Sequence, residues 1–269
     1  MIARPPVLTP SNPVVELGRG FVLPFRALSI MFSTPRLLRL TSAVAALTVA
    51  SLAVLVWALV QVTPGLVALI WKPPAEWWLG WLHTLLTVFV FLLLLVLGAN
   101  TVPMTLAAPL MDPLSLATER AMGIEVPDTG GLGRLVAEIL RAVKNALARL
   151  VVLYAGHAIL LLLLVIPGGA VVWTWAGWAW TTVWLAAQYL DVPMARHLYR
   201  FAEVKRVVRA RFFLLFGFGA AIYLLLWIPL LNFFFVPVAV IGSTMLFRGL
   251  VGAGTLAPPS DEAPPAALR

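Results

Sequence analysis

The sequence predicts an all-α integral membrane protein with two long transmembrane helices and two shorter helical hairpins. Of its 269 residues, 62% are hydrophobic and 11% are charged, whereas soluble domains carry about 25% charged residues. Two long runs, 40–70 and 77–110, contain no charged side chain. Each exceeds the about 20 residues that one bilayer crossing needs. A water-soluble fold is therefore excluded.

The ends of the chain differ in composition from its centre. Residues 1–19 are expected to be a flexible tail, because prolines crowd their first part. Residues 253–269 are rich in alanine and proline and are expected to be disordered. Between them, residues 20–252 read as one helical membrane domain. The first apolar run starts too far in, and is too long, for a cleavable signal peptide.

The two long runs are predicted to be full crossings joined by a short interfacial turn. The stretch WKPPAEWW (71–78) separates them, and its Pro73 and Pro74 break the helix. Its tryptophans are typical of a membrane–water interface. Further along the chain, apolar and basic side chains alternate with helical period in 134–150. This pattern predicts an amphipathic helix on the membrane surface, with binding of a partner helix as the alternative.

The last hairpin is predicted to penetrate the membrane only partway. Its arms, 212–227 and 233–247, flank the turn IPLLN. Each arm is about 24 Å long at about 1.5 Å per residue, against a hydrocarbon core of about 30 Å. Pro229 breaks the first arm, and Asn232 can cap the second.

The first hairpin, 150–188, turns at IPGG (166–169) and either spans fully or penetrates partway. Its five tryptophans are expected to form an interfacial or packing belt. His157, within this hairpin, either titrates in a pathway or donates to a nearby carbonyl group.

Basic residues set the orientation. They gather before the first long run, around 134–149, in 196–211 and at Arg248, whereas Lys72 lies on the opposite side. Positively charged loops stay on the cytoplasmic side. Both termini are therefore expected to be cytoplasmic.

Several classes of function are disfavoured. The chain has no cysteine and three scattered histidines, without a HExxH or Walker A pattern. We therefore expect no enzymatic activity, metal site or cofactor. The net charge of +8 suits an anionic membrane surface better than nucleic acid. The spans hold no Asp or Glu, which a proton-coupled carrier usually needs.

The stretch STPRLLRL (33–40) is a candidate anion site. Pro35 favours a helix start, where free amides and the positive dipole end are exposed. Arg36 and Arg39 are three residues apart and so share one face of that helix. Together these groups can bind an oxyanion. The alternative is that both arginines are ordinary topology determinants that contact lipid phosphates.

Three segments, at 106–123, 186–197 and 228–247, together resemble the CysZ family of bacterial inner-membrane proteins associated with sulfate uptake. IPLLNFFFVPVAVIGSTMLF (228–247) is similar to the family's last hairpin, and LAAPLMDPLSLATERAMG (106–123) to the end of its second long helix. AAQYLDVPMARH (186–197) is similar to a Gln-Tyr-x-Asp-x-Pro stretch of the family. The resemblance implies two long transmembrane helices and two hairpins that penetrate partway.

The resemblance also implies a sulfate site at the start of the first long helix, in a Pro-Gly-Leu-Arg-Arg-like motif. Pro35, Leu37 and Arg39 match that motif, whereas Arg36 stands in place of glycine and Leu38 in place of the first arginine. The implied anion-binding residues are Arg36, Leu37 and Arg39. Polar residues expected to line or gate the path are Asn100, Glu119 and Asn232, with Glu119 pairing with Arg120 or Arg196.

The resulting hypothesis is an inner-membrane oxyanion permease, a channel or facilitator that passes sulfate or sulfite for sulfur uptake. Hairpins that stop within lipid need protein neighbours, so a homo-oligomer is also expected. The alternative is a non-transporting membrane protein that organises lipids or partner proteins. Its support is the basic amphipathic stretch and the altered anion motif.

Overall fold

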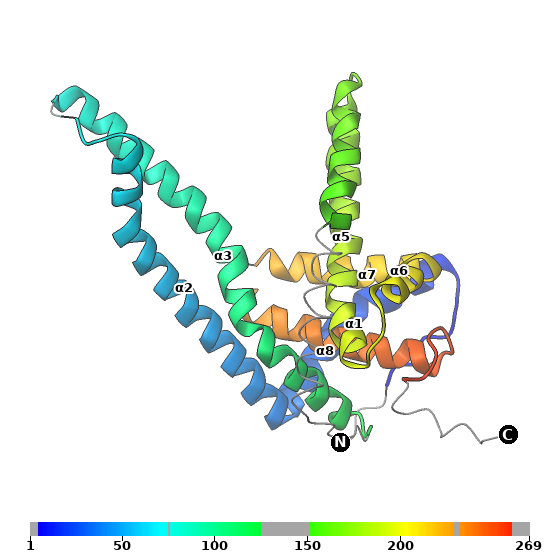
Figure 1. The fold of residues 1–269 in the computed structure, drawn as a ribbon. Coiled ribbons are helices and arrows are strands. Elements are labelled where there is room, and N and C mark those ends of the chain that lie inside the picture. The colour runs from blue at the N-terminus through cyan, green and yellow to red at the C-terminus, as the bar shows by residue number, and fades with distance from the viewer. Residues whose placement is uncertain (1–4, 75, 125–150, 229–231, 260–269) are drawn as a thin grey trace. The chain divides into compact units, whose positions relative to one another are not determined.

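The computed structural model describes residues 5–74, 76–124, 151–228 and 232–259, and the regular structure in these ranges is helical (Figure 1). By contacts the chain divides into two compact units, one of Ser42–Leu110 and one of Met1–Thr41 with Met111–Arg269. The prediction of an all-α membrane protein is confirmed, since three helices in the described ranges are long and apolar enough to cross a bilayer.

The unit Ser42–Leu110 contains most of the two long helices, α2 (Pro35–Ile70) and α3 (Trp77–Ala121). The helices run antiparallel. Near the turn, the rings of Trp71 and His83 meet edge to face at 5.7 Å. Further down, a Cβ atom on Gly98 would lie 2.9 Å from Leu55 Cδ2, so the two helices approach closely there. The two predicted crossings are confirmed as helices of spanning length.

The other unit begins with a helix that the sequence analysis missed, α1 (Pro13–Ser33). The side chain of Asn12 accepts a hydrogen bond from the amide of Val15 at 2.9 Å, and Pro13 occupies the first turn. The helix ends because Thr34 precedes Pro35 and is extended (φ −118°, ψ 104°).

The tails predicted at 1–19 and 253–269 need correction for the residues that the structure describes. At the first end, Leu8 is 2% exposed and packs on Gly249 of α8 (Asn232–Gly252). At the other, Leu256 is buried, and the hydroxyl of Tyr199 donates to the carbonyl of Ala257. Composition predicted tails at both ends, but within residues 5–19 and 253–259 apolar side chains pack against the helical core.

Helix α7 (Phe212–Leu226) is central in this unit, because α1, α8 and α5 (Gly169–Arg196) all pack against it. Two glycines permit this. A Cβ atom on Gly217 would collide with the backbone carbonyl of Leu17 in α1, and one on Gly219 with that of Thr182 in α5. Small residues on two faces of one helix allow its neighbours to approach backbone to backbone.

The first predicted hairpin is present. Residues 151–161 are helical, the 3₁₀ turn η1 (Leu162–Val165) follows, and Gly168 adopts φ +77° before α5 begins. The left-handed conformation explains the glycine at this turn. The second arm is longer than the sequence suggested, because α5 continues to Arg196. The Nδ1 of His157 donates to the Leu153 carbonyl at 3.0 Å, which confirms the second of the two readings of this histidine.

The two arms of the second hairpin differ in length, although the sequence predicted two equally short arms. Before it, α6 (Phe201–Ala210) meets α7 at a bend of 102°. The 15 residues of α7 are short for a crossing, as predicted, but α8 has 21 residues and its part Phe234–Gly252 is long enough to span. The tip at 229–231 lies outside the described residues, so partway penetration stays a prediction. The predicted amphipathic helix at 134–150 also lies outside them.

Candidate functional site

The start of α2 places the predicted anion-binding residues on one helical turn. The carbonyl of Thr34 accepts the first helical hydrogen bond, from the amide of Leu38 at 3.0 Å. Leu37 is fully buried, whereas Arg36 and Arg39 are exposed. The buried leucine therefore fixes the turn and leaves both guanidinium groups facing outward. Neither arginine forms an ion pair within the part of the chain that the structure describes.

The end of α3, which belongs to the unit with Met111–Arg269, carries a buried ion cluster around Glu119. The Oε1 atom of Glu119 accepts from Arg248 Nε at 2.8 Å and from His197 Nε2 at 2.9 Å. Its Oε2 atom accepts from Arg196 Nη1 at 3.0 Å. This pairing with Arg196 confirms one of the two expected partners.

The cluster joins the ends of three helices. Glu119 comes from α3, Arg196 from the last turn of α5 and Arg248 from α8. The ring of His197 stacks on Phe247 at 5.2 Å, which orients the imidazole toward the carboxylate. Nearby, the hydroxyl of Thr244 donates to that of Ser115 at 3.0 Å, a second polar link between α8 and α3.

Electrostatics keep the Glu119 carboxylate ionised. Burial alone would raise its pKa, but the hydrogen bond from His197 and the charges of His197, Arg248 and Arg196 outweigh burial and hold the pKa below its usual value. The side chain of Glu119 is 0% exposed, that of Arg248 is 4% and that of Arg196 is 17%. Arg196 is therefore the arginine of this cluster that solvent reaches most easily.

A second buried ion pair lies elsewhere in this unit. Arg211, at the bend between α6 and α7, donates from Nε to Glu16 of α1 at 2.8 Å and from Nη1 to Thr255 at 3.1 Å. Its Nη2 atom is buried and has no hydrogen-bond partner among the residues that the structure describes. The pair ties α1 and the C-terminal turn to the bend.

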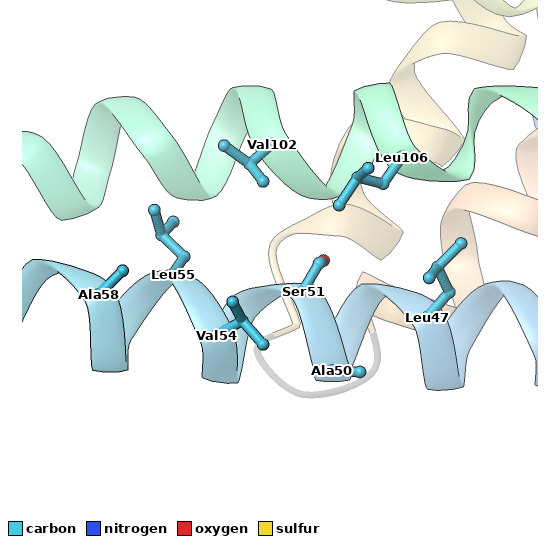
Figure 2. Close-up of a pocket in the computed structure, with 8 residues that line it drawn as sticks. All are labelled: Leu47, Ala50, Ser51, Val54, Leu55, Ala58, Val102 and Leu106. Carbon is cyan, nitrogen blue, oxygen red and sulfur yellow. The ribbon is translucent and has the colours of Figure 1, made fainter.

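The unit Ser42–Leu110 has a cavity of about 420 Å³ between α2 and α3 (Figure 2). Leu55, Val102 and Leu106 line it, and the polar group drawn there, the Ser51 hydroxyl, donates to the Thr48 carbonyl at 2.8 Å. An apolar lining with its hydroxyl already engaged does not suit an anion, because a buried charge needs hydrogen-bond partners.

Comparison with protein families decides the relationship of this chain. The family model described as Sulfate transporter CysZ/Etoposide-induced protein 2.4 matches residues 23–237. The match covers most of the chain and extends from α1 into α8. The chain belongs to this family. The predicted family is confirmed, and with it a transporter role in general terms.

In this CysZ-family chain the predicted site residues are distributed over both units. Arg36, Leu37 and Arg39 share one turn, and Glu119 sits in the ion cluster. Asn100 lies on α3 within Ser42–Leu110, and Asn232 is the first residue of α8; the side chains of these two residues lie outside what the structure describes. Their roles in a pathway stay predictions.

The cluster partners His197 and Arg248 were not singled out by sequence reasoning. Arg248 was read as a topology determinant, although it follows an apolar run that becomes the buried part of α8. A charge at such a position requires a partner of opposite sign. That argument indicates that Arg248 needs an acidic partner. It does not identify Glu119, because the two residues are 129 positions apart and no local sequence pattern connects them.

Proposed function

We propose that this CysZ-family protein is an oxyanion permease that passes sulfate or a related sulfur oxyanion through the bacterial inner membrane. It acts as a channel or facilitator for sulfur uptake, with both termini cytoplasmic. The match to a family of sulfate transporters supports the substrate class. The uncharged runs 40–70 and 77–110 of the two long helices support passage without proton coupling by carboxylates in the spans.

One observation carries the proposal: Arg36 and Arg39, which are exposed and have no carboxylate partner among the described residues, lie at the start of the first long helix. The first-turn amides of a helix have no partner within it, and the dipole is positive there. An oxyanion at this turn would receive backbone amides together with the guanidinium groups of Arg36 and Arg39. Arg36, two positions before Leu38, would supply the cation that the family motif carries at the place of Leu38.

Glu119 is proposed to gate the path through the arginines that it holds. While the carboxylate binds Arg196 and Arg248, the Nη1 donor of Arg196 and the Nε donor of Arg248 are not available to an anion. An oxyanion that reaches the partly exposed Arg196 would compete with Glu119 for it. Asn100 and Asn232 are proposed to offer neutral polar groups along the path. A homo-oligomer would supply the protein neighbours that a partway hairpin needs.

Flux into proteoliposomes tests the proposal. The purified chain is reconstituted, and uptake of radiolabelled sulfate, sulfite and thiosulfate is measured against concentration. Arg39→Ala and Arg36→Ala are expected to raise KM about tenfold or more, because a hydrogen bond to a charged group contributes about 1.5–3 kcal/mol.

Arg26→Ala is the matched control, since Arg26 is an exposed arginine of α1 outside the helix start. It removes the same charge and is expected to leave KM unchanged. Absence of saturable uptake of any of the three anions would refute transport. Normal oxyanion uptake in cells that lack the protein, together with a captured partner, would favour the organising role instead.

A further inference from the structure

An apolar groove of about 900 Å³ lies on the face of the first hairpin that adjoins α6. It is bounded by the helical residues 151–161, by α5 and by the α6–α7 corner, all within one unit of the structure. Its lining includes Gly156, Leu160 and Ala176. The volume lies in the range of sites that bind small organic ligands. The proposed transport function does not use this groove.

Aromatic side chains form one wall of the groove. Trp180 and Trp184 are stacked with ring centroids 6.5 Å apart, and Trp184 meets Phe201 edge to face at 6.2 Å. The indole N–H of Trp180 is already used, because it donates to the Leu153 carbonyl at 3.3 Å. The wall therefore presents apolar ring surface to the groove.

The end of the groove at α6 is basic. Lys205 and Arg209 line it, lie one turn apart on the same helix and are exposed. The ammonium group of Lys205 lies 5.7 Å from the centroid of the Phe201 ring, which places it at the end of the aromatic wall. Within the described residues, neither cation is paired with a carboxylate.

The groove is basic at the end where α6 is expected to lie at the membrane surface, and apolar along the hairpin that leads away from α6. Helix α6 is amphipathic, with Phe201, Val204 and Val207 buried and basic residues outward, as expected for a helix at the level of the lipid head groups. The hairpin leads away from it, from the contact of Trp180 with Leu153 toward Leu160 and Ala176. A ligand must therefore be anionic at one end and apolar along the rest.

We propose that this groove binds an anionic phospholipid, with its phosphate between Lys205 and Arg209 and an acyl chain along the aromatic wall. Basic pockets between membrane helices commonly hold such head groups. A free phosphate or sulfate ion would leave the apolar length of the groove without a ligand. The basic segment 134–149 of this chain would bring like charge to Lys205 and Arg209.

Native mass spectrometry of the full chain in detergent tests the site. The chain is titrated with dioleoylphosphatidylglycerol, and with dioleoylphosphatidylcholine as the zwitterionic lipid with the same acyl chains. We expect tighter binding of phosphatidylglycerol. The double variant Lys205→Ala/Arg209→Ala is expected to weaken it about tenfold, because each basic residue near an anionic surface contributes to binding.

Two further variants separate the site from general surface charge. Arg206→Ala removes an exposed cation of α6 that does not line the groove and is expected to leave affinity unchanged. Ala176→Trp narrows the apolar part without altering charge and is expected to weaken binding. Size-exclusion chromatography verifies that each variant is folded.

Three outcomes would overturn the proposal. The first is equal loss of phosphatidylglycerol in the double variant and in Arg206→Ala. The second is equal binding of the two lipids by the native chain. The third is displacement of bound lipid by millimolar inorganic phosphate or sulfate, which would assign the basic end to a free ion.

Discussion

Replacing Glu119 by glutamine is expected to destabilise the helical unit strongly. The substitution keeps the size of the side chain and removes its charge. Glu119 accepts hydrogen bonds from Arg248, His197 and Arg196 at 2.8–3.0 Å, and its side chain is 0% exposed. In the variant, an amide N–H₂ replaces one acceptor oxygen, and the guanidinium groups of Arg196 and Arg248 cannot accept from it because they can only donate.

The magnitude follows from how much charge is left buried. Arg248 is 4% exposed and Arg196 is 17% exposed, so neither can recover its hydration fully. Removing one partner of a buried ion pair costs about 3–5 kcal/mol. At about 2–4 °C per kcal/mol for a chain of this size class, the midpoint of thermal unfolding should fall by roughly 6 to 20 °C.

Thermal unfolding in detergent micelles, followed by near-ultraviolet circular dichroism, measures the effect. Glu203→Gln is the matched control, because Glu203 caps the amide of Arg200 at 2.9 Å from a partly exposed position and glutamine can accept the same bond. It should change stability by less than about 0.5 kcal/mol. Glu16→Gln should fall between the two, since its carboxylate pairs with one arginine, Arg211.

The reasoning would be refuted if Glu119→Gln unfolded at the same temperature as Glu203→Gln. A second variant checks the electrostatic cause. Adding Arg248→Gln to Glu119→Gln removes the most buried unpaired charge, so the double variant should be more stable than the sum of the two single losses predicts. Strict additivity would mean that packing, and not charge, holds this corner.

Two further predictions follow from the same unit. Because the pKa of Glu119 is lowered in the folded protein, its carboxylate stabilises the fold above the unfolded-state pKa of about 4.3, and this contribution is lost as pH falls through the folded-state value. The difference in stability between the native chain and Glu119→Gln should therefore shrink between pH 7 and pH 3. A constant difference would contradict this. Gly217→Ala should lower the free energy of unfolding by about 1–3 kcal/mol, because the new Cβ atom meets the Leu17 carbonyl and pushes α1 away from α7. Gly18→Ala is the control: a Cβ atom there has nothing within 4 Å, so the change should be neutral or slightly stabilising in the same unfolding assay.

Strongly periodic and strongly apolar features were predictable from sequence. The two uncharged runs exceed a bilayer thickness, and an uncharged apolar run of that length becomes a helix whatever surrounds it, because its backbone groups must bond to one another in lipid. The proline turn at 71–78 and the glycine turn at 166–169 were also predictable, because each depends on residues within the turn itself. The helix start at Pro35 followed from the backbone restrictions that proline imposes on itself and on Thr34.

Tertiary contacts decided what composition left open. The N-terminal segment looked like a tail, yet Leu8 packs on Gly249, and the backbone of α1 approaches α7 closely at Gly217. The ion cluster could not be predicted from the sequence for the same reason. Glu119 and Arg248 are 129 residues apart, and they become partners only where α3 and α8 meet in the folded chain. Local sequence sets where helices form in a membrane, because hydrogen bonding within each helix is local. Which buried charges neutralise each other depends on distances that exist only in the folded chain.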